Sequence, residues 1–201
     1  MDGVILERSG YSIINKNMLT QNVQVILKEI DQVLSQVDEK QVDEMERMIL
    51  GANVIVCVGA GRVGLAVKGF AMRLGHFGKT AFMIGDTTVP HIGEGDLLLV
   101  CSGSGETQTI YDLVEIAKKN KASIALITGN AESRMGQLAD AVVEVKAPSK
   151  TKNVAGFVSV QPMTTLNEQS LGIFLDALVL KLMNTLGETH DTMWERHSNL
   201  E

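Results

Sequence analysis

The sequence predicts an α/β fold, a three-layer αβα sandwich built on a five-stranded parallel sheet. Five short runs rich in β-branched residues are continuously apolar, a pattern typical of strands that are buried on both faces. Segments with helical spacing separate these runs, as the crossover connections of a parallel sheet require. A chain of 201 residues with 45% hydrophobic content is long enough for one domain, residues 1–201, with a substantial core.

The first elements expected are two helices within residues 17–50, where apolar residues recur at helical spacing around a polar break at 38–40. The sheet core is expected within residues 53–146. Its five strands are predicted by "NVIVCVGAG", "TAFMIGD", "DLLLVCSGSG", "ASIALITGN" and the weaker "DAVVEVKAP". Helices are predicted between the strands at residues 62–74, 107–120 and 133–138.

The last part of the chain, residues 163–201, is predicted to hold a long apolar helix that starts near Thr165, followed by a polar tail. The polar stretch 147–162 before it has no strong periodicity. A segment of this kind is expected to be a mobile loop near a site.

The charge distribution argues against nucleic acid and anionic membranes as partners, because the formal net charge is −6 and the basic residues are scattered. Asp2 and Glu7 occupy positions where a secretory signal would be basic and then apolar, and no run approaches the roughly 20 apolar residues of a membrane-spanning helix. A cytoplasmic location is therefore expected. Cys57 and Cys101 end apolar runs, which predicts two buried thiols, and with four scattered histidines no metal site is expected.

The glycines of "VGAGRVG" follow a predicted strand and precede a predicted helix. Gly59, Gly61 and Gly64 satisfy the G-x-G-x-x-G pattern, and Asp86 ends the next strand where a ribose-binding acid could lie, so a nicotinamide dinucleotide is one interpretation. Arg62 inside the loop, and the absence of residues suited to hydride transfer, argue against it. Another interpretation is that the glycines only permit a tight turn with close packing.

The segment "SGSGET" ends an apolar run in hydroxyls and glycines. Gly103 and Gly105 free the turn that carries Ser102 and Ser104, and a helix is predicted to open near Thr107. Unpaired N–H groups at a helix start bind phosphate without bulk positive charge, although these hydroxyls could also serve only as caps. Because loops at the carboxyl ends of neighbouring parallel strands converge, both loops are expected to face one ligand.

Five segments, "GAGRVG", "AMRLGHFG", "CSGSGET", "QPMTTLNEQS" and "RHSNLE", resemble the sugar isomerase (SIS) family, and the likeness extends over nearly the whole chain. The resemblance implies a flavodoxin-like parallel sheet. It also implies a homotetramer, a dimer of dimers, in which neighbouring subunits complete each site. The chain departs from similar proteins at two positions: Val63 stands where serine is frequent, and Asp86 where glutamate is frequent.

The activity implied by the resemblance is the interconversion of D-arabino-hex-3-ulose 6-phosphate and fructose 6-phosphate. Moving a carbonyl from C3 to C2 requires a base for the carbon-bound proton and donors for the enediol(ate) oxygens, but no redox cofactor. A small-molecule sugar phosphate is thus the implied ligand. The implied functional partner is a hexulose-6-phosphate synthase in the ribulose monophosphate pathway, operating in formaldehyde assimilation or in pentose synthesis.

The resemblance also assigns candidate site residues. Glu168 matches the proposed base, whereas its other interpretation is a capping-box partner of Thr165. His197 in the tail is the second catalytic candidate, acting in a neighbour's site; His76 and Thr88 are additional candidates, with a structural role favoured for His76 at the end of a helix. The substrate- and phosphate-binding set is Gly59, Gly61, Arg62, Ser102, Gly103, Ser104 and Thr107.

Three alternatives stay open on the sequence. Arg62 could form a surface ion pair instead of holding the substrate. The whole chain could be a module that binds a sugar phosphate without turnover, or an isomerase of another phosphosugar. Glu168 and the tail favour the enzyme, because a sensor needs only the hydroxyl loop.

Overall fold

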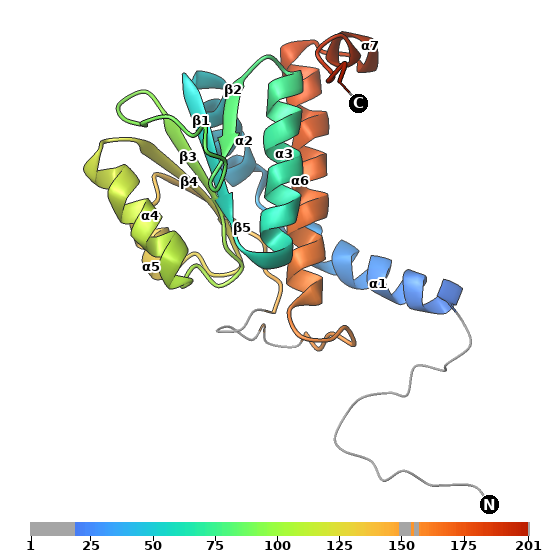
Figure 1. Ribbon diagram of the computed structural model, residues 1–201. Coiled ribbons are helices and arrows are strands. Elements are labelled where there is room, and N and C mark those ends of the chain that lie inside the picture. Colours follow the sequence, from blue (N-terminus) through green and yellow to red (C-terminus); the bar gives the residue numbers. More distant parts are fainter. Residues whose placement is uncertain (1–18, 149–153, 155–156, 201) are drawn as a thin grey trace, which may run out of the picture.

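Five parallel strands form the centre of the protein, in the order β2-β1-β3-β4-β5 (Figure 1). The computed structural model describes residues 19–148, 154 and 157–200. The strands are β1 (Val54–Gly59), β2 (Thr80–Met83), β3 (Leu97–Cys101), β4 (Ser123–Thr128) and β5 (Ala141–Glu144). Every neighbouring pair runs parallel. The predicted sheet is therefore confirmed, in the flavodoxin-like order with its switch point between β1 and β3.

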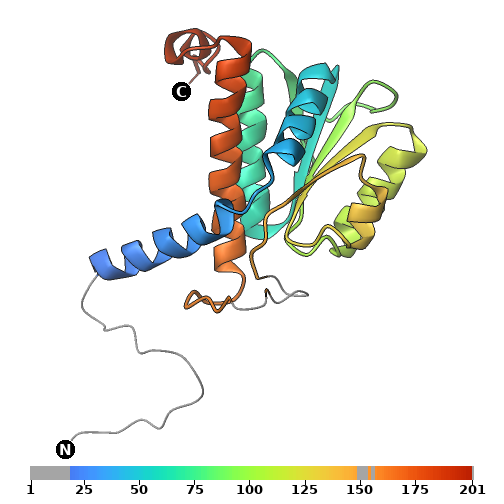
Figure 2. The same cartoon turned by 180° about the vertical axis from the view of Figure 1, so that it is seen from behind.

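Helices cover both faces of this sheet, which confirms the predicted three layers (Figures 1 and 2). On one face lie α2 (Glu39–Gly51), α3 (Gly61–His76) and α6 (Thr165–Leu186). On the other lie α4 (Gln108–Lys119) and α5 (Arg134–Leu138). Before them α1 (Leu19–Leu34) extends away from the sheet, and α7 (His190–Trp194) follows α6. Two helices precede the first strand as predicted, although residues 17 and 18 lie outside the described part.

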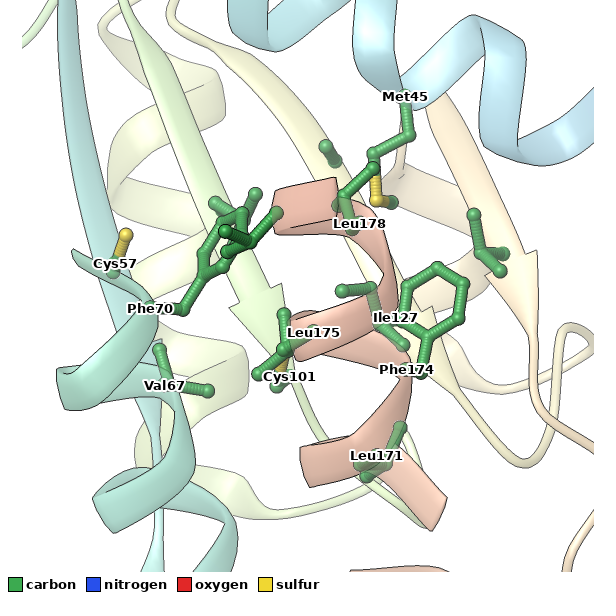
Figure 3. Close-up of a cluster of buried hydrophobic side chains, with 14 of the residues drawn as sticks. Met45, Cys57, Val67, Phe70, Cys101, Ile127, Leu171, Phe174, Leu175 and Leu178 are labelled. Atoms are coloured by element: carbon green, nitrogen blue, oxygen red, sulfur yellow. The ribbon is translucent and has the colours of Figure 1, made fainter. Parts of the chain in front are cut away.

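Consecutive residues of each central strand belong to different halves of the core. Ile55 and Cys57 of β1 pack in the cluster under α3 and α6, whereas Val56 and Val58 pack in the cluster under α4. Figure 3 shows the first cluster, where side chains of α6 meet those of the sheet, of α3 and of α2. Burial on both faces is the reason that these strands are continuously apolar in sequence.

Both cysteines lie in the first cluster and are free. Burial raises the pKa of the Cys57 thiol to about 12, and it raises the pKa of Cys101 as well. The two thiols are therefore uncharged core side chains at neutral pH, as the sequence predicted.

The long helix α6 is apolar around much of its circumference. By length and composition alone it could cross a membrane, so the expectation that no segment approaches that composition is wrong for α6. One face of α6, with Leu171, Leu175 and Leu178, packs in the core (Figure 3). Its outer face carries the exposed side chains of Ile173 and Leu180. A helix that is apolar on both sides is typically covered on both, so the outer face of α6 is expected to pack against another protein surface.

Candidate active site

An open cavity of ≈ 220 Å³ lies at the carboxyl ends of β1 and β3, where the strand order reverses. Crevices at this switch point are the usual ligand sites of open parallel sheets. Three segments distant in sequence meet there: the glycine loop (residues 59–64), the hydroxyl loop (residues 102–107) and the start of α6. The lining residues are Ala60, Gly61, Val63, Gly103, Ser104, Thr107, Thr164, Asn167 and Glu168.

Three helices begin at this cavity, and among the described residues the side chain of none of their N-cap residues caps the helix. The N-cap residues are Ala60 of α3, Thr107 of α4 and Thr164 of α6, and no side-chain cap hydrogen bond is made by any of the three. The first N–H groups of a helix lack partners within the helix and carry the positive end of its dipole. Their convergence gives the cavity donors for an anion although the chain is acidic.

The glycine loop combines a tight turn with one cavity residue. A Cβ on Gly64 would lie 2.7 Å from the Gly59 carbonyl oxygen, so these two glycines allow β1 and α3 to approach closely. Gly61 has φ +59 and lines the cavity. The close-packing interpretation therefore holds for Gly59 and Gly64. Asp86 is exposed in the loop after β2 and pairs with Lys68 at 3.4 Å instead of lining the cavity.

The two serines of the hydroxyl loop lie in different environments. Ser104 and Thr107 line the cavity together with Gly103. Ser102 is only 4% exposed, lies outside the lining, and its Oγ accepts a hydrogen bond from the Gly105 N–H at 3.2 Å. Ser102 therefore shapes the turn, and its contact with phosphate stays a prediction.

Hydrogen bonds from Arg134, at the start of α5, fix the hydroxyl loop in place. The Arg134 N–H donates to Glu106 Oε1 at 2.9 Å, and its guanidinium donates to Glu106 Oε2 at 2.7 Å and to the Glu106 carbonyl at 3.0 Å. The backbone hydrogen bond from Arg134, followed by that of its side chain, lowers the pKa of Glu106. Gly105 packs so closely on this segment that a Cβ there would lie 1.9 Å from Ser133 Oγ. Glu106 thus fixes the loop and does not line the cavity.

Glu168 lines the cavity one turn into α6 and is 22% exposed. The Arg62 guanidinium donates to its Oε2 at 2.9 Å, and the Thr164 hydroxyl donates to its Oε1 at 3.0 Å. The predicted capping box of Thr165 and Glu168 is wrong, because Thr164 is the N-cap and Thr165 is the first helical residue. Arg62 makes an ion pair, as one interpretation expected, but its partner is the candidate base.

Asn167 is a cavity residue that sequence reasoning missed. It is 2% exposed, and its Nδ2 is buried with no hydrogen-bond partner among the described residues. A Cβ on Gly103 would lie 2.1 Å from Asn167 Oδ1, so only glycine leaves room for this amide. The signal was present in the sequence: Asn167 falls at helical spacing with Leu171, Phe174 and Leu178, so it is a polar residue on the apolar face of a predicted helix.

The histidine candidates lie at the opposite end of α3 and α6. The sequence placed His76 just after a helix, but His76 is the last residue of α3. Its ring centroid lies 5.2 Å from that of His197. The Trp194 ring stacks on His197 at 4.8 Å. Because α6 runs 22 residues, about 33 Å, between the two ends, His197 does not reach Glu168 of its own chain.

Thr88 is exposed in the loop after β2 and does not line the cavity. Within the part of the chain that the structure describes, no group of three or more His, Cys, Asp or Glu side chains is arranged to hold a metal ion. The chemistry available in the cavity is therefore that of a carboxylate, a guanidinium, an amide, hydroxyls and helix N–H groups.

Comparison with known proteins places this architecture in a family. The model of the SIS domain matches residues 48–171. The chain is 37% identical over 182 residues to a 3-hexulose-6-phosphate isomerase of Bacillus subtilis, covering 90% of this chain and 98% of that protein. It is 40% identical over 183 residues to a 3-hexulose-6-phosphate isomerase of Mycobacterium gastri, covering 91% and 92%.

Solved structures are similar to this chain over most of its length. A crystal structure of a hypothetical protein superposes with a TM-score of 0.82 at 34% identity, covering 90% of this chain and 97% of that one. A Methanococcus jannaschii protein, whose structure was described as inferring the function of 3-hexulose-6-phosphate isomerase, superposes with a TM-score of 0.77 at 27% identity, covering 90% and 99%. The chain belongs to the SIS domain family.

Proposed function

We propose that this protein is an isomerase that interconverts D-arabino-hex-3-ulose 6-phosphate and fructose 6-phosphate. The observation that carries the proposal is the carboxylate of Glu168 beside a cavity where three helices start without side-chain caps. The cavity thus combines a general base with an anion site. Relatives that carry the name 3-hexulose-6-phosphate isomerase match nearly the whole chain, which supports the same reaction here.

The phosphate group is assigned to the hydroxyl loop and the start of α4. Ser104 and Thr107 line the cavity together with Gly103, whose missing side chain makes room for the Asn167 amide. A dianion at this position interacts with N–H groups at the positive end of the α4 dipole, and hydrogen bonds to a charged group are the stronger kind. The negative charge of the protein as a whole is then no obstacle to binding.

The proton transfer is assigned to Glu168. The carboxylate takes the proton from C2 of the hex-3-ulose, which leaves an enediolate across C2 and C3, and returns a proton to C3 so that the carbonyl forms at C2. The oxygen proton moves from the C2 hydroxyl to the C3 oxygen in the same isomerisation. For this step the Arg62 guanidinium must move away from the Glu168 carboxylate. The Arg62 side chain is 56% exposed, so it can turn toward a substrate oxygen.

Asn167 is assigned to the substrate as well. Its amide lies one residue before the base and has an unpartnered buried donor among the described residues. Leaving a buried donor unpaired costs about 1–3 kcal/mol. A substrate oxygen that accepts from this amide would remove that cost, so the amide would bind the substrate and orient it over Glu168.

A tetramer of two dimers is part of the proposal, with His197 and His76 of a neighbouring subunit reaching the site. Support comes from exposed apolar side chains along the outer face of α3 and α6, namely Leu65, Met72, Ile173 and Leu180. An exposed apolar face of this extent marks an interaction surface. The enzyme would act in the cytoplasm beside a hexulose-6-phosphate synthase, in formaldehyde assimilation or pentose synthesis.

Incubation with fructose 6-phosphate in deuterium oxide tests the reaction. We expect solvent deuterium on the carbon skeleton beside the moving carbonyl, together with a 3-ketose product, by NMR and mass spectrometry. A protein that binds fructose 6-phosphate without label or product would be a sensor, and that result would overturn the proposal. Label with an aldose product would assign another phosphosugar isomerase.

A further inference from the structure

A buried carboxylate of α1 that takes no part in the proposed reaction holds the segment leading into α6. Glu29 is 7% exposed, and its two oxygens accept three hydrogen bonds. Its Oε1 accepts from the Val160 N–H at 2.8 Å, and its Oε2 accepts from the Ser159 hydroxyl at 2.8 Å and from Gln161 Nε2 at 2.9 Å. A helix 130 residues earlier in the chain thus binds residues 159–161 (Figure 1).

Short-range hydrogen bonds link the segment that Glu29 binds to the start of α6, which carries the candidate base. The Gln161 N–H donates to Ser159 Oγ at 3.0 Å, and the Thr165 N–H donates to the Pro162 carbonyl at 3.2 Å. Glu168 follows in the first turn of α6. A displacement of residues 159–161 would therefore move the start of the helix that carries Glu168.

Gln161 indicates which group controls this contact. Its Nε2 donates to Glu29, while its Oε1 is buried with no partner among the described residues. Turning the amide would place a carbonyl oxygen against the carboxylate. The negative charge of Glu29 therefore fixes the amide in the orientation observed.

Anchoring α1 to the protein does not require this carboxylate. Ile30 and Val33, on the same helix, are already buried in the core cluster with residues of α6. Burying a charged group is costly unless donors compensate for it, and an apolar residue would pack at this position without that cost. Instead, the buried carboxylate of Glu29 accepts hydrogen bonds from three donors, all in residues 159–161.

We infer that Glu29 is a positioning residue of the active site: it fixes residues 159–161 and thereby the first turn of α6, so that Glu168 faces the cavity. The inference rests on the proposed role of Glu168 as base. It assigns to α1 a part in turnover, although α1 contributes no residue to the cavity lining.

The test compares Glu29→Gln with Glu46→Gln. Glu46 is buried to a similar extent, 8% exposed, and accepts from the Thr185 hydroxyl at 2.6 Å, but it contacts the far end of α6. In Glu29→Gln the charge is lost and one oxygen becomes an NH2 donor, so the three donors can no longer all be accepted and the contact weakens. We expect kcat for fructose 6-phosphate to fall roughly 10- to 100-fold, as misplacement of a reacting group by about 1 Å does, while KM changes by less than about threefold.

Glu46→Gln should keep kcat near that of the wild type, and Glu29→Asp, which keeps the charge, should recover part of the loss. Equal kcat values for Glu29→Gln and Glu46→Gln, with both folded by circular dichroism, would overturn the inference. So would a loss confined to KM.

Hydrogen exchange followed by mass spectrometry separates this inference from the proposed reaction. Peptides that cover Val160 and Glu168 should exchange faster in Glu29→Gln than in Glu46→Gln. If the wild-type protein has no isomerase activity, the proposed function fails, and exchange alone then decides whether Glu29 holds the segment. Unchanged exchange at both amides would show that it does not.

Discussion

The three helices that start at the cavity differ from α2, α5 and α7 in whether an N-cap side chain accepts a hydrogen bond from the first turn. Asp38, Ser133 and Thr189 cap α2, α5 and α7 by accepting backbone N–H bonds through their side chains. The N-cap residues of α3, α4 and α6 make no such bond, although those of α4 and α6 are threonines with a suitable hydroxyl. The difference separates helices that complete the framework from helices that keep donors for a ligand.

The physical cost of this difference is modest and local. An N-cap side chain stabilises a protein by about 1 kcal/mol, so three uncapped starts forgo a noticeable part of a small stability margin. At α6 the Thr164 hydroxyl donates to Glu168 instead of accepting from the backbone. A lower stability at these helix starts is consistent with the proposed binding of the substrate there.

The strongest test of the cavity helices removes the base. Glu168→Gln keeps the size of the side chain and leaves the α4 anion site untouched, so fructose 6-phosphate should still bind while kcat falls about 10²–10⁴-fold. Steady-state kinetics and calorimetric titration measure the two effects. A near-normal kcat would remove Glu168 from the mechanism.

The same variant tests whether the two ends of α6 meet across subunits. Removing residues 196–201 should also lower turnover if His197 serves a neighbour's site. Mixing this truncated protein with Glu168→Gln under conditions of subunit exchange should then restore part of the activity. Proven mixed oligomers without recovery would show that His197 acts within its own chain or takes no part.

Removal of the hydroxyls tests the anion site. Replacing both Ser102 and Ser104 with alanine should raise KM strongly while the fold persists, because each hydrogen bond lost to a charged group costs about 1.5–3 kcal/mol. The single variants divide the effect: Ser104→Ala should raise KM more, since only Ser104 lines the cavity. An unchanged KM in the double variant would contradict a phosphate at this loop.

A pair of N-cap variants tests the comparison itself. Asp38→Ala should lower the free energy of unfolding by about 1 kcal/mol and leave KM unchanged, because Asp38 caps α2 away from the cavity. Thr107→Ala should lower it by less and raise KM. Urea denaturation and steady-state kinetics give both numbers, and equal losses of stability would mean that the two kinds of helix start do not differ.

The smallest effect expected is a pH dependence from Glu106. Its pKa in the folded protein lies below the ordinary value of 4.5, so its contribution to stability is present above that pH and is lost as the pH falls through the lowered pKa. Since the pair with Arg134 is partly exposed, the contribution should stay below about 1 kcal/mol. Denaturation of wild type and Glu106→Gln should therefore differ at neutral pH and converge in acid.

Local patterns were enough to predict the sheet, its flanking helices and the two loops. Continuous apolar runs identified all five strands. For β1, β3 and β4 the reason is burial on both faces, whereas the edge strands β2 and β5 are only partly buried. Glycines and hydroxyls at the ends of β1 and β3 identified the cavity loops, since parallel strands bring their carboxyl ends to one edge. These features depend on residues close together in sequence.

The direction of each side chain in the site was decided by contacts between distant segments. Ser102 and Ser104 are equivalent in the sequence, yet the turn buries one hydroxyl and presents the other to the cavity. Glu29 has no feature in its helix that indicates residues 159–161, 130 residues later. The sequence by itself therefore determined the elements and the loops, whereas the tertiary structure decided which side chains meet, because packing of distant elements, and not local pattern, sets that geometry.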